Sequence, residues 1–439
     1  MNISVIGLGK LGLATAACFA SKGHSVIGLD KNDFIMNELL QKRCPIDEAG
    51  LPELLEKSWE YLKITRDMKE AVDGSDITLI ITPTPSNKDH RFNNEYIEQA
   101  LKAIAPYLKD KAEYHIVDVV STVMPRSSDQ VFKPLLEKLT GKTCGKDFSL
   151  VYNPEFIALG SVIKNFLYPD MVLIGASDQY AADQLEKLYV TTCESSPSIA
   201  KMSLINAEIT KLSLNCYVTM KISFANELAS ICEKVPGADI DIITDAIGED
   251  SRVGKKYLNG GLGFGGPCFP RDNLAFQAFA DEFGVKARLG KQVTEINHNV
   301  VDRLNRIIQE NVNKGEKVSL LGISYKPGTH IIENSQPITF AQQLQRAGFK
   351  VALHDPKALD SAKEQLGNDI DYCEDIYHCI AGASAIVLLT NWGYYKEVDW
   401  DKVGKIANEN VLLLDSWRSL KELSKVSRFN YVALGIGKE

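Results

Sequence analysis

The first part of the chain alternates short apolar runs with longer segments of mixed character. The apolar runs are Ile3–Ile6, Ser25–Leu29, Ile77–Ile81, His115–Val119 and Leu150–Val151. Such runs predict buried strands, and the segments between them are long enough to be helices. Because parallel strands are joined by helical crossovers, the pattern predicts a doubly wound α/β sheet.

A second alternation of the same kind begins near Lys317. Its strand candidates are Val318–Gly322, Lys350–His354, Ala385–Thr390, Val411–Asp415 and Tyr431–Leu434, with helical stretches such as Pro337–Ala347 between them. The pattern predicts another doubly wound parallel-sheet domain.

The stretch between Pro197 and Pro236 contains no Pro or Gly and carries apolar residues at helical spacing. It predicts a helix longer than one ordinary domain requires, which suits a domain connector and a subunit interface. We therefore expect three domains, at residues 1–196, 197–300 and 301–439, the middle one helical. A chain of 439 residues is also too long for a single core.

Composition narrows the class of protein. The net charge of −8 argues against a nucleic-acid binder. No segment approaches the ~20 apolar residues of a membrane span, and the chain starts without the pattern of a signal peptide. The nine cysteines show no metal-site spacing, so we expect reduced thiols, a cytoplasmic location and no metal.

A glycine fingerprint follows the first predicted strand. Gly7, Gly9 and Gly12 form GxGxxG, and Asp30 ends the next strand. The glycines allow a tight turn, close approach of a pyrophosphate and close helix packing, while Asp30 accepts hydrogen bonds from ribose hydroxyls and repels a 2′-phosphate. The pattern predicts NAD binding, although Lys31 could accept a phosphate and a purely structural glycine turn is the alternative.

Five glycines lie among the seven residues Gly260–Gly266, shortly before Cys268. Since Asn273–Phe283 reads as a helix, Cys268 precedes a helix N-terminus, which favours a thiolate with a pKa below the usual ~8.5. A thiolate beside a nicotinamide can capture an aldehyde as a thiohemiacetal, which loses a second hydride to give a thioester. The alternative is a buried, small apolar residue.

Several segments together carry a family resemblance. They are the N-terminal GxGxxG, Thr82-Pro-Thr-Pro85, Ser121-Thr-Val-Met-Pro125, Asn153-Pro-Glu-Phe156, Lys211 with Asn215, Asp250-Ser-Arg-Val-Gly254, Gly263-Phe-Gly-Gly-Pro-Cys-Phe-Pro-Arg-Asp272 and Lys326-Pro327. In this order they resemble the UDP-glucose/GDP-mannose dehydrogenase family along essentially the whole chain. The resemblance implies Rossmann-like NAD-binding and nucleotide-sugar-binding domains at the two ends of the chain. It also implies four-electron oxidation of a nucleotide sugar to the uronate, with UDP-glucose as the leading substrate.

The resemblance also implies roles for individual residues. In the chemistry, Cys268 carries the covalent intermediate, Lys211 and Asn215 stabilise an oxyanion, and Asp272, Glu155 and Thr122 position or deprotonate water. The implied cofactor contacts are Gly7, Gly9, Leu11, Gly12, Asp30, Lys31, Thr82, Pro83, Thr122 and Arg271. The implied substrate contacts are Glu155, Phe156, Lys211, Asn215, Arg252, Tyr257, Phe264, Gly265, Lys326 and Arg418. Arg252 matches an arginine contributed by a neighbouring subunit, so a homodimer is implied.

Each assignment has a simpler alternative. Lys211 could be a solvated cation, Asn215 a polar core residue, Glu155 and Asp272 helix caps, and Thr122 a loop hydroxyl. Arg252 and Arg418 could be surface cations, and Trp392 and Trp417 are better interpreted as core or interface residues.

The chain departs from the family pattern at three places. Leu159 replaces a second glutamate, so a UDP-N-acetylhexosamine or GDP-mannose type substrate stays open. Glu333 lies where a cofactor-side arginine is common, and the spacing of Asp415 and Arg418 is unusual. Two alternative functions belong to other classes: a non-catalytic nucleotide-sugar sensor and a two-electron 3-hydroxyacid-type dehydrogenase.

Overall fold

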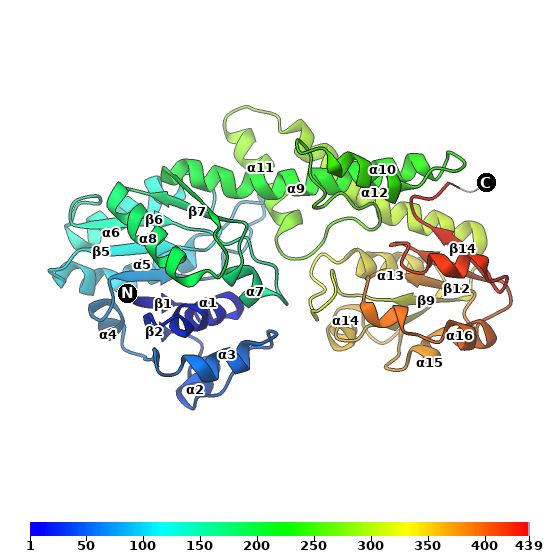
Figure 1. The fold of residues 1–439 in the computed structure, drawn as a ribbon, viewed down its shortest axis with the longest axis horizontal. Helices are drawn as coiled ribbons and strands as arrows, with labels where there is room; N and C mark the ends of the chain where they lie inside the picture. Colours follow the sequence, from blue (N-terminus) through cyan, green and yellow to red (C-terminus); the bar gives the residue numbers. More distant parts are fainter. Residues whose placement is uncertain (438–439) are drawn as a thin grey trace. The chain divides into compact units, whose positions relative to one another are not determined.

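The protein's structure is a computed structural model that describes residues 1–437. It divides into two compact units, Met1–Ser213 and Leu214–Glu439 (Figure 1). The predicted fold class is confirmed: two doubly wound sheets are present, with a long helix and further helices between them along the chain. The three domain boundaries expected above stay a prediction.

The first unit is built on an eight-stranded sheet in the order β3-β2-β1-β4-β5-β6-β7-β8. Its strands are β1 (Asn2–Ile6), β2 (Ser25–Leu29), β3 (Leu62–Ile64), β4 (Ile77–Ile80), β5 (His115–Val119), β6 (Phe148–Tyr152), β7 (Met171–Ala176) and β8 (Ser198–Met202). Neighbouring strands are parallel except β6 and β7, which pair antiparallel. The chain order reverses between β1 and β4, and this reversal marks the crevice where α/β sheets bind ligands.

Helices cover both faces of this sheet. On one face, α1 (Lys10–Ser21), α2 (Asp33–Leu40), α3 (Leu51–Ser58), α7 (Val162–Leu167) and α8 (Gln179–Thr192) bury residues such as Leu13, Phe19 and Phe166. On the other face, α4 (Met68–Asp73), α5 (Glu95–Asp110) and α6 (Lys133–Thr140) bury Ile104 and Leu136. The short π-helix η1 (Ser128–Phe132) leads into α6.

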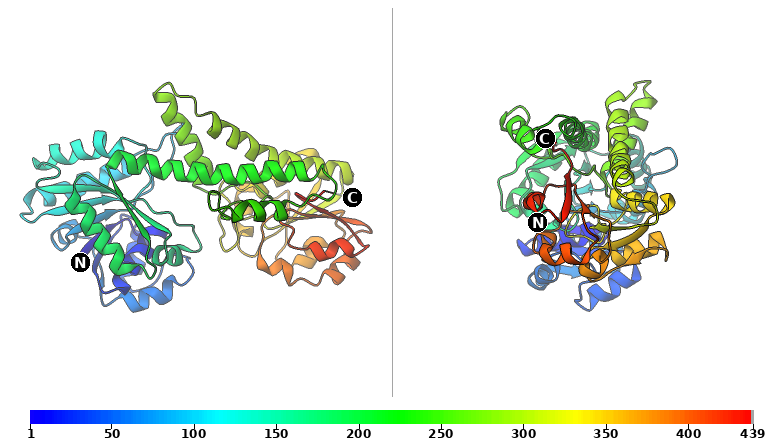
Figure 2. Two further views of the ribbon diagram at one scale, coloured as in Figure 1. Left: turned by 45° about the horizontal axis from the view of Figure 1, so that its top comes forward. Right: turned by 90° about the vertical axis from the view of Figure 1, so that its right-hand side faces the viewer.

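The long helix predicted between Pro197 and Pro236 is α9 (Leu204–Cys232), which has 29 residues and appears unbroken in Figure 2. At ~1.5 Å per residue it is about 43 Å long. The start of the predicted stretch is strand β8 instead, because Ser198–Met202 pairs in parallel with β7. The helix includes the division between the two units.

The second unit carries a six-stranded, all-parallel sheet in the order β11-β10-β9-β12-β13-β14. Its strands are β9 (Lys317–Leu321), β10 (Lys350–His354), β11 (Asp371–Tyr372), β12 (Ala385–Leu388), β13 (Val411–Asp415) and β14 (Phe429–Ala433). Helices α12 (Arg288–Asn311), α13 (Gln336–Ala347) and α14 (Leu359–Leu366) pack on one face. On the opposite face lie α15 (Ile376–Ile380), α16 (Trp400–Ile406) and the 3₁₀ turns η2 (Gly393–Lys396) and η3 (Lys421–Lys425). In the sequence, α10 (Ile240–Glu249) and α11 (Phe269–Glu282) lie between α9 and α12.

Candidate active site

The glycine turn after β1 is shaped by two close approaches and one open position. Gly7 has φ +97°, and a Cβ at this residue would lie 3.0 Å from the carbonyl carbon of Ile81 and closer still to its oxygen. A Cβ on Gly12 would lie 2.9 Å from the carbonyl carbon of Gly7, also with the oxygen nearer. At Gly9 a Cβ would meet no atom of the described chain within 4 Å. The turn therefore leaves open space at the N-terminus of α1, where a pyrophosphate fits.

Asp30 follows β2 and helps to hold this turn. Its Oδ2 accepts a hydrogen bond from the Leu8 N–H at 2.6 Å, and its Oδ1 accepts one from the Asn32 N–H at 2.7 Å. A carboxylate has about four acceptor positions, so it can still accept from ribose hydroxyls. The ammonium of Lys31 lies 4.0 Å from the centre of the Tyr96 ring, and Leu11 packs against the core of the unit. The residues of this turn fit NAD.

The loops after β4 and β5 are joined by hydroxyl groups. The Thr82 N–H donates to Ser121 Oγ at 2.9 Å, and Ser121 Oγ donates to the Thr82 carbonyl at 2.6 Å. Thr84 Oγ1 donates to the carbonyl oxygen of Thr122 at 2.7 Å. The sequence predicts site roles for Thr82, Pro83 and Thr122, whereas the structure adds Ser121 and Thr84 as the residues that join these loops. These loops leave the carboxyl ends of β4, which pairs with β1, and of β5, which pairs with β4, on the side of the crevice that the strand order defines.

Glu155 lies in the loop after β6 and is held by two neighbouring elements. Tyr189 on α8 donates to Glu155 Oε1 at 2.9 Å and to Asn153 Oδ1 at 2.6 Å. Loss of hydration raises the pKa of the Glu155 carboxyl to about 7, although the Tyr189 hydrogen bond and the charge of Lys211 act in the opposite direction. Such a pKa suits a group that gains and loses a proton near neutral pH.

Lys211, on α9, is 6% exposed, so its interpretation as a solvated cation is wrong. Its Nζ donates to the backbone oxygen of Glu155 at 2.7 Å and lies 4.3 Å from the centre of the Phe156 ring. Leu159, a few residues further along, packs partly buried against the core of the first unit.

Cys268 is exposed and occupies the N-cap of α11, with Pro270 in the first turn. The predicted position before a helix N-terminus is confirmed, and the interpretation as a buried apolar residue is wrong. The helix begins at Phe269, earlier than the predicted Asn273, because Pro is well accommodated in a first turn. The exposed sulfur therefore lies at the positive end of the α11 dipole.

Asp272 and Asn215 meet in the interior beneath this helix start. Asn215 Nδ2 donates to Asp272 Oδ2 at 2.6 Å, and the two residues are 7% and 1% exposed. Arg271 Nε lies 3.6 Å from Asp272 Oδ1. A second contact between the same helices joins Asn273 Nδ2 to Thr219 Oγ1 at 2.8 Å, and the sequence gave no signal for this pair. These two contacts fix α9 against α11.

Aromatic residues lie around the start of α11. Phe264 is buried, and its ring centre is 6.4 Å from that of Phe269, which is 6.3 Å from that of Tyr257. Arg252 is well exposed and pairs with Asp250 at 2.6 Å, which leaves its surface-cation alternative open.

Side chains from several elements hold the glycine loop, and sequence reasoning missed most of them. Asn226 Oδ1 accepts from Gly261 N–H at 2.8 Å, and Gln336 Oε1 accepts from Gly263 N–H at 2.7 Å. Asn297 pairs with both backbone groups of Phe264. A single sequence gives no signal for these residues, because an amide on a helix far along the chain has no local pattern.

Arg418 also holds this loop. Its Nη2 donates to the Gly260 carbonyl at 2.6 Å, its Nη1 to the Leu434 carbonyl at 2.9 Å, and its Nε pairs with Asp241 at 2.9 Å. The side chain is 3% exposed, so the surface-cation alternative is wrong. The direct substrate contact expected for Arg418 stays a prediction.

The segment after β9 approaches the far end of the glycine loop. The Gly266 N–H donates to the carbonyl of Glu333 at 3.0 Å, and a Cβ on Gly266 would lie 2.6 Å from the Tyr325 ring. Lys326, the next residue, has its Nζ 5.9 Å from the centre of that ring.

Asp355 occupies in the second sheet the place that Asp30 has in the first, directly after the second strand in chain order. Its Oδ2 accepts from the N–H groups of Ile323 and Ser324, from the Ser324 hydroxyl and from Trp392 Nε1. Its Oδ1 accepts from two further backbone N–H groups, and the residue is 3% exposed. Six donors inside the protein leave this carboxylate no capacity for ribose hydroxyls.

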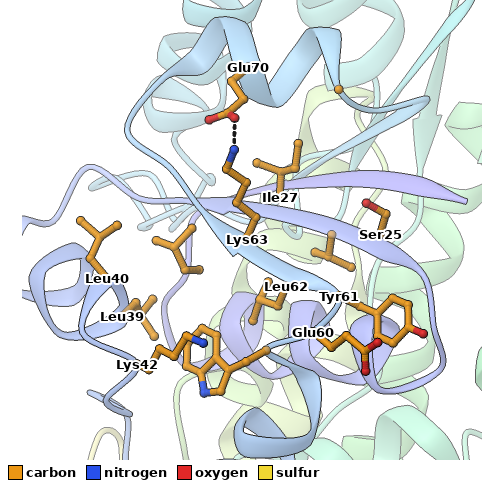
Figure 3. Close-up of a pocket in the computed structure, with 14 residues that line it drawn as sticks. Ser25, Ile27, Leu39, Leu40, Lys42, Glu60, Tyr61, Leu62, Lys63 and Glu70 are labelled. Atoms are coloured by element: carbon orange, nitrogen blue, oxygen red, sulfur yellow. Dashed lines mark hydrogen bonds and ion pairs between the residues drawn. The ribbon is translucent and has the colours of Figure 1, made fainter.

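A cavity of about 560 Å³ lies elsewhere in the first unit, against β2 and the edge strand β3 (Figure 3). Leu39, Trp59, Leu62 and the ion pair between Lys63 and Glu70 are among its lining residues, and none of the predicted site residues lines it. It therefore has no part in the proposed chemistry.

Two features of other classes of protein are absent from residues 1–437. No helix among them is long and apolar enough to cross a membrane, and no group of three or more His, Cys, Asp or Glu residues could hold a metal ion.

Three models of one family match successive parts of the chain. The NAD binding domain of the UDP-glucose/GDP-mannose dehydrogenase family matches residues 1–193, its central domain matches 205–299, and its UDP binding domain matches 319–422. Among curated relatives, a UDP-glucose 6-dehydrogenase (AglM) of Haloferax volcanii is 35% identical over 91% of this chain and 93% of its own. One of Bacillus subtilis (TuaD) is 32% identical over 100% of this chain and 93% of its own.

Solved structures agree with this assignment. A UDP-glucose dehydrogenase of Pyrobaculum islandicum superposes with a TM-score of 0.88 at 30% identity, covering 100% of this chain and 97% of its own. A UDP-D-ManNAc dehydrogenase of Pyrococcus horikoshii has a TM-score of 0.82 at 24% identity, covers 99% of both chains and supports the fold alone. The glycine turn, the exposed cysteine and the three matched domains together make this chain a member of the UDP-glucose/GDP-mannose dehydrogenase family of NAD-dependent oxidoreductases.

Proposed function

We propose that the chain oxidises the C6 alcohol of UDP-glucose to the carboxylate of UDP-glucuronate. The observation that carries the proposal is the exposed Cys268 at the N-cap of α11, four residues before Asp272, whose buried carboxylate accepts a hydrogen bond from Asn215 of α9. The full-length relatives named UDP-glucose 6-dehydrogenase support this substrate. NAD, when bound, supplies the hydride acceptor for both oxidations.

In the first oxidation the alcohol loses a proton and a hydride to become an aldehyde. Cys268 then forms a carbon–sulfur bond to the aldehyde carbon, and the thiohemiacetal loses a second hydride and a proton to become a thioester. Water breaks the carbon–sulfur bond, which releases the carboxylate and returns the thiol. The chain's task is to hold a reactive sulfur and to manage protons at each step.

The proton transfers and the stabilisation of the oxyanion are proposed for residues whose surroundings suit these tasks. We propose Asp272, held by Asn215, and Glu155, with its pKa near 7, as the groups that position and deprotonate water, together with Thr122. Lys211 and Asn215, four residues apart on α9, are proposed to stabilise the oxyanion.

The remaining contacts are proposed in the same way. Phe156, Tyr257, Phe264, Gly265, Arg252 and Lys326 are proposed for the substrate. The proposed cofactor contacts are the glycine turn, Asp30 and Lys31, together with Leu11, Thr82, Pro83 and Arg271. Arg418 is proposed to act through its hold on the Gly260 carbonyl.

A second candidate substrate follows from Leu159. The residue presents an apolar side chain, packed against the core, where the family often has a carboxylate. This change favours testing a UDP-N-acetylhexosamine and GDP-mannose beside UDP-glucose. The oxidation chemistry is the same for all of them.

The deciding experiment compares wild type with Cys268→Ser on this panel of sugars and counts NADH against product by mass spectrometry. We expect two NADH per uronate from wild type and no uronate from the variant, because an alkoxide from serine is a poor substitute for a thiolate. Cys44→Ser, at a partly buried thiol of the first unit, is the matched control and should retain activity. One NADH per sugar, or full uronate production by Cys268→Ser, would refute the thioester route.

We also propose a homodimer formed along α9. Exposed or partly exposed apolar side chains recur at steps of three, four or seven residues on this helix and just past its end: Leu214, Tyr217, Phe224, Leu228, Ile231 and Val235. Such a stripe has the spacing of a helix-packing seam. A second copy of the chain presents the same stripe, so the surface is self-complementary.

The domain roles are part of the proposal. We propose residues 1–196 as the NAD-binding domain, 197–300 as the dimerisation domain with the reactive cysteine, and 301–439 as the nucleotide-sugar-binding domain. A cytoplasmic location stays a prediction.

A further inference from the structure

The glycine loop is held by side-chain amides from two helices of the second unit. Asn297, on α12, accepts the Phe264 N–H with its Oδ1 at 2.8 Å and donates to the Phe264 carbonyl with its Nδ2 at 2.9 Å. Gln336, at the start of α13, accepts the Gly263 N–H at 2.7 Å and donates to the backbone oxygen of Asn297 at 2.7 Å. The two amides and the loop backbone therefore form one connected network.

Both amide residues are buried, with Asn297 8% and Gln336 7% exposed. Buried polar networks that are fully hydrogen-bonded rigidify a structure, and loss of one member leaves costly unpaired groups. The amides therefore fix the backbone at Gly263 and Phe264 in one conformation.

Gly263 itself supports this account. A Cβ at this position would lie 2.5 Å from Gln336 Nε2 and closer still to Asn297 Oδ1. The glycine is needed because protein side chains occupy the space next to its backbone.

We infer that Asn297, with Gln336, is a positioning residue that sets the loop from Gly263 to Cys268 in its reactive form before the substrate arrives. This inference rests on the proposed function, in which Phe264 and Gly265 bind the sugar and Cys268 attacks it. Misplacement of a reacting group by about 1 Å can cost ~100-fold in rate, so a preformed loop contributes directly to turnover.

The test compares Asn297→Asp with a matched variant on the same helix. In Asn297→Asp the acceptor for the Phe264 N–H remains, but a carboxylate oxygen replaces the donor and faces the Phe264 carbonyl. Asn305→Asp is the control, because Asn305 is also buried on α12 and also pairs with a glutamine of α13, Gln343. Its Nδ2 donates to the Val301 carbonyl on α12 and to Gln343 Oε1 on α13.

Two readouts separate the inference from the proposed function. Amide hydrogen exchange of the 258–268 peptide needs no turnover, and we expect it to accelerate at least about tenfold in Asn297→Asp but not in Asn305→Asp. Turnover with UDP-glucose should fall at least about tenfold in kcat for Asn297→Asp, while the affinity for UDP alone stays within about twofold. If wild type oxidises no nucleotide sugar, the proposed function fails while the exchange measurement still decides whether the amides fix the loop.

Other outcomes overturn the inference. Unchanged loop exchange in Asn297→Asp, equal effects of the two variants, or faster exchange with unaltered kcat would each remove the positioning role. If Asn297→Asp does not fold, Gly263→Ala disturbs the same network from the backbone side, and the same two readouts apply to it.

Discussion

The glycine turn allows folding and cofactor binding to be perturbed separately. Gly9→Ala and Gly12→Ala each add one methyl group, three residues apart. At Gly9 the methyl meets no atom of the described chain within 4 Å, and φ is −70°, a value that any residue adopts. At Gly12 the methyl would lie 2.9 Å from the Gly7 carbonyl carbon, well inside the ~3.5 Å of a carbon–carbon contact.

The expected changes in stability and in NAD affinity therefore differ between the two variants. For Gly9→Ala the loss of chain entropy in the unfolded state, worth about 0.4–1 kcal/mol, is offset by the poorer N-cap preference of Ala, so stability changes by less than about 1 kcal/mol. The same methyl occupies the open space at the N-terminus of α1 and removes about two charge-assisted hydrogen bonds to the pyrophosphate, roughly 3 kcal/mol or ~100-fold in NAD affinity. For Gly12→Ala the overlap is with backbone, so we expect a loss of stability of about 1–3 kcal/mol or more.

The assay pairs urea unfolding without NAD with calorimetric titration of NAD. Gly9→Ala should unfold at nearly the wild-type urea midpoint yet bind NAD about 100-fold more weakly. Gly12→Ala should unfold at a lower midpoint. A Gly9→Ala variant that binds NAD like wild type would show that the pyrophosphate does not approach this turn and would refute the reasoning.

Three further predictions rest on contacts and exposed residues described above. Tyr189→Phe removes a hydrogen bond that lowers the pKa of Glu155, so the pKa should rise. The acidic limb of the plot of kcat/KM against pH, expected near pH 7, should therefore move to higher pH. An unchanged limb would exclude Glu155 as the group that must ionise. Because the folded-state pKa of Glu155 is raised from 4.5 to about 7, its contribution to stability is present below pH 4.5 and is lost as the pH rises through 7, which urea midpoints across this range would measure. Phe224→Asp, in the middle of the α9 stripe, should give monomers by light scattering. The control Phe34→Asp, at an exposed residue of α2, should leave the dimer intact. A dimeric Phe224→Asp variant would place the interface elsewhere.

Much of the fold could be predicted because its determinants are local. Buried strands such as β10 and β13 are bounded by polar residues, and their predicted limits are the observed ones. Strand β3 has three residues, and β8 has no fully buried residue, so neither carries a clear apolar run. The antiparallel pairing of β6 with β7 depends on the path between them, which apolar periodicity does not encode.

The candidate site divides in the same way. Gly7, Asp30 and Cys268 could be found because their positions beside strand ends or a helix start follow from nearby residues. Asn297 and Gln336 act on a loop more than thirty residues away in sequence, at separations of 33 and 73 residues for their hydrogen bonds. A contact of that kind becomes visible only once the fold brings the helices together.

The saturated carboxylate of Asp355 has a consequence for the catalytic cycle. Because Asp355 in the second sheet cannot accept from a ribose, the turn at Gly9 is the one of these two strand-end turns, within residues 1–437, that is suited to a dinucleotide. A four-electron oxidation with one such cofactor site requires NADH to leave and a second NAD to bind between the two hydride transfers. Under the proposed function, the half-oxidised sugar has to stay bound during that exchange, and the proposed bond to Cys268 would keep it from leaving as a free aldehyde.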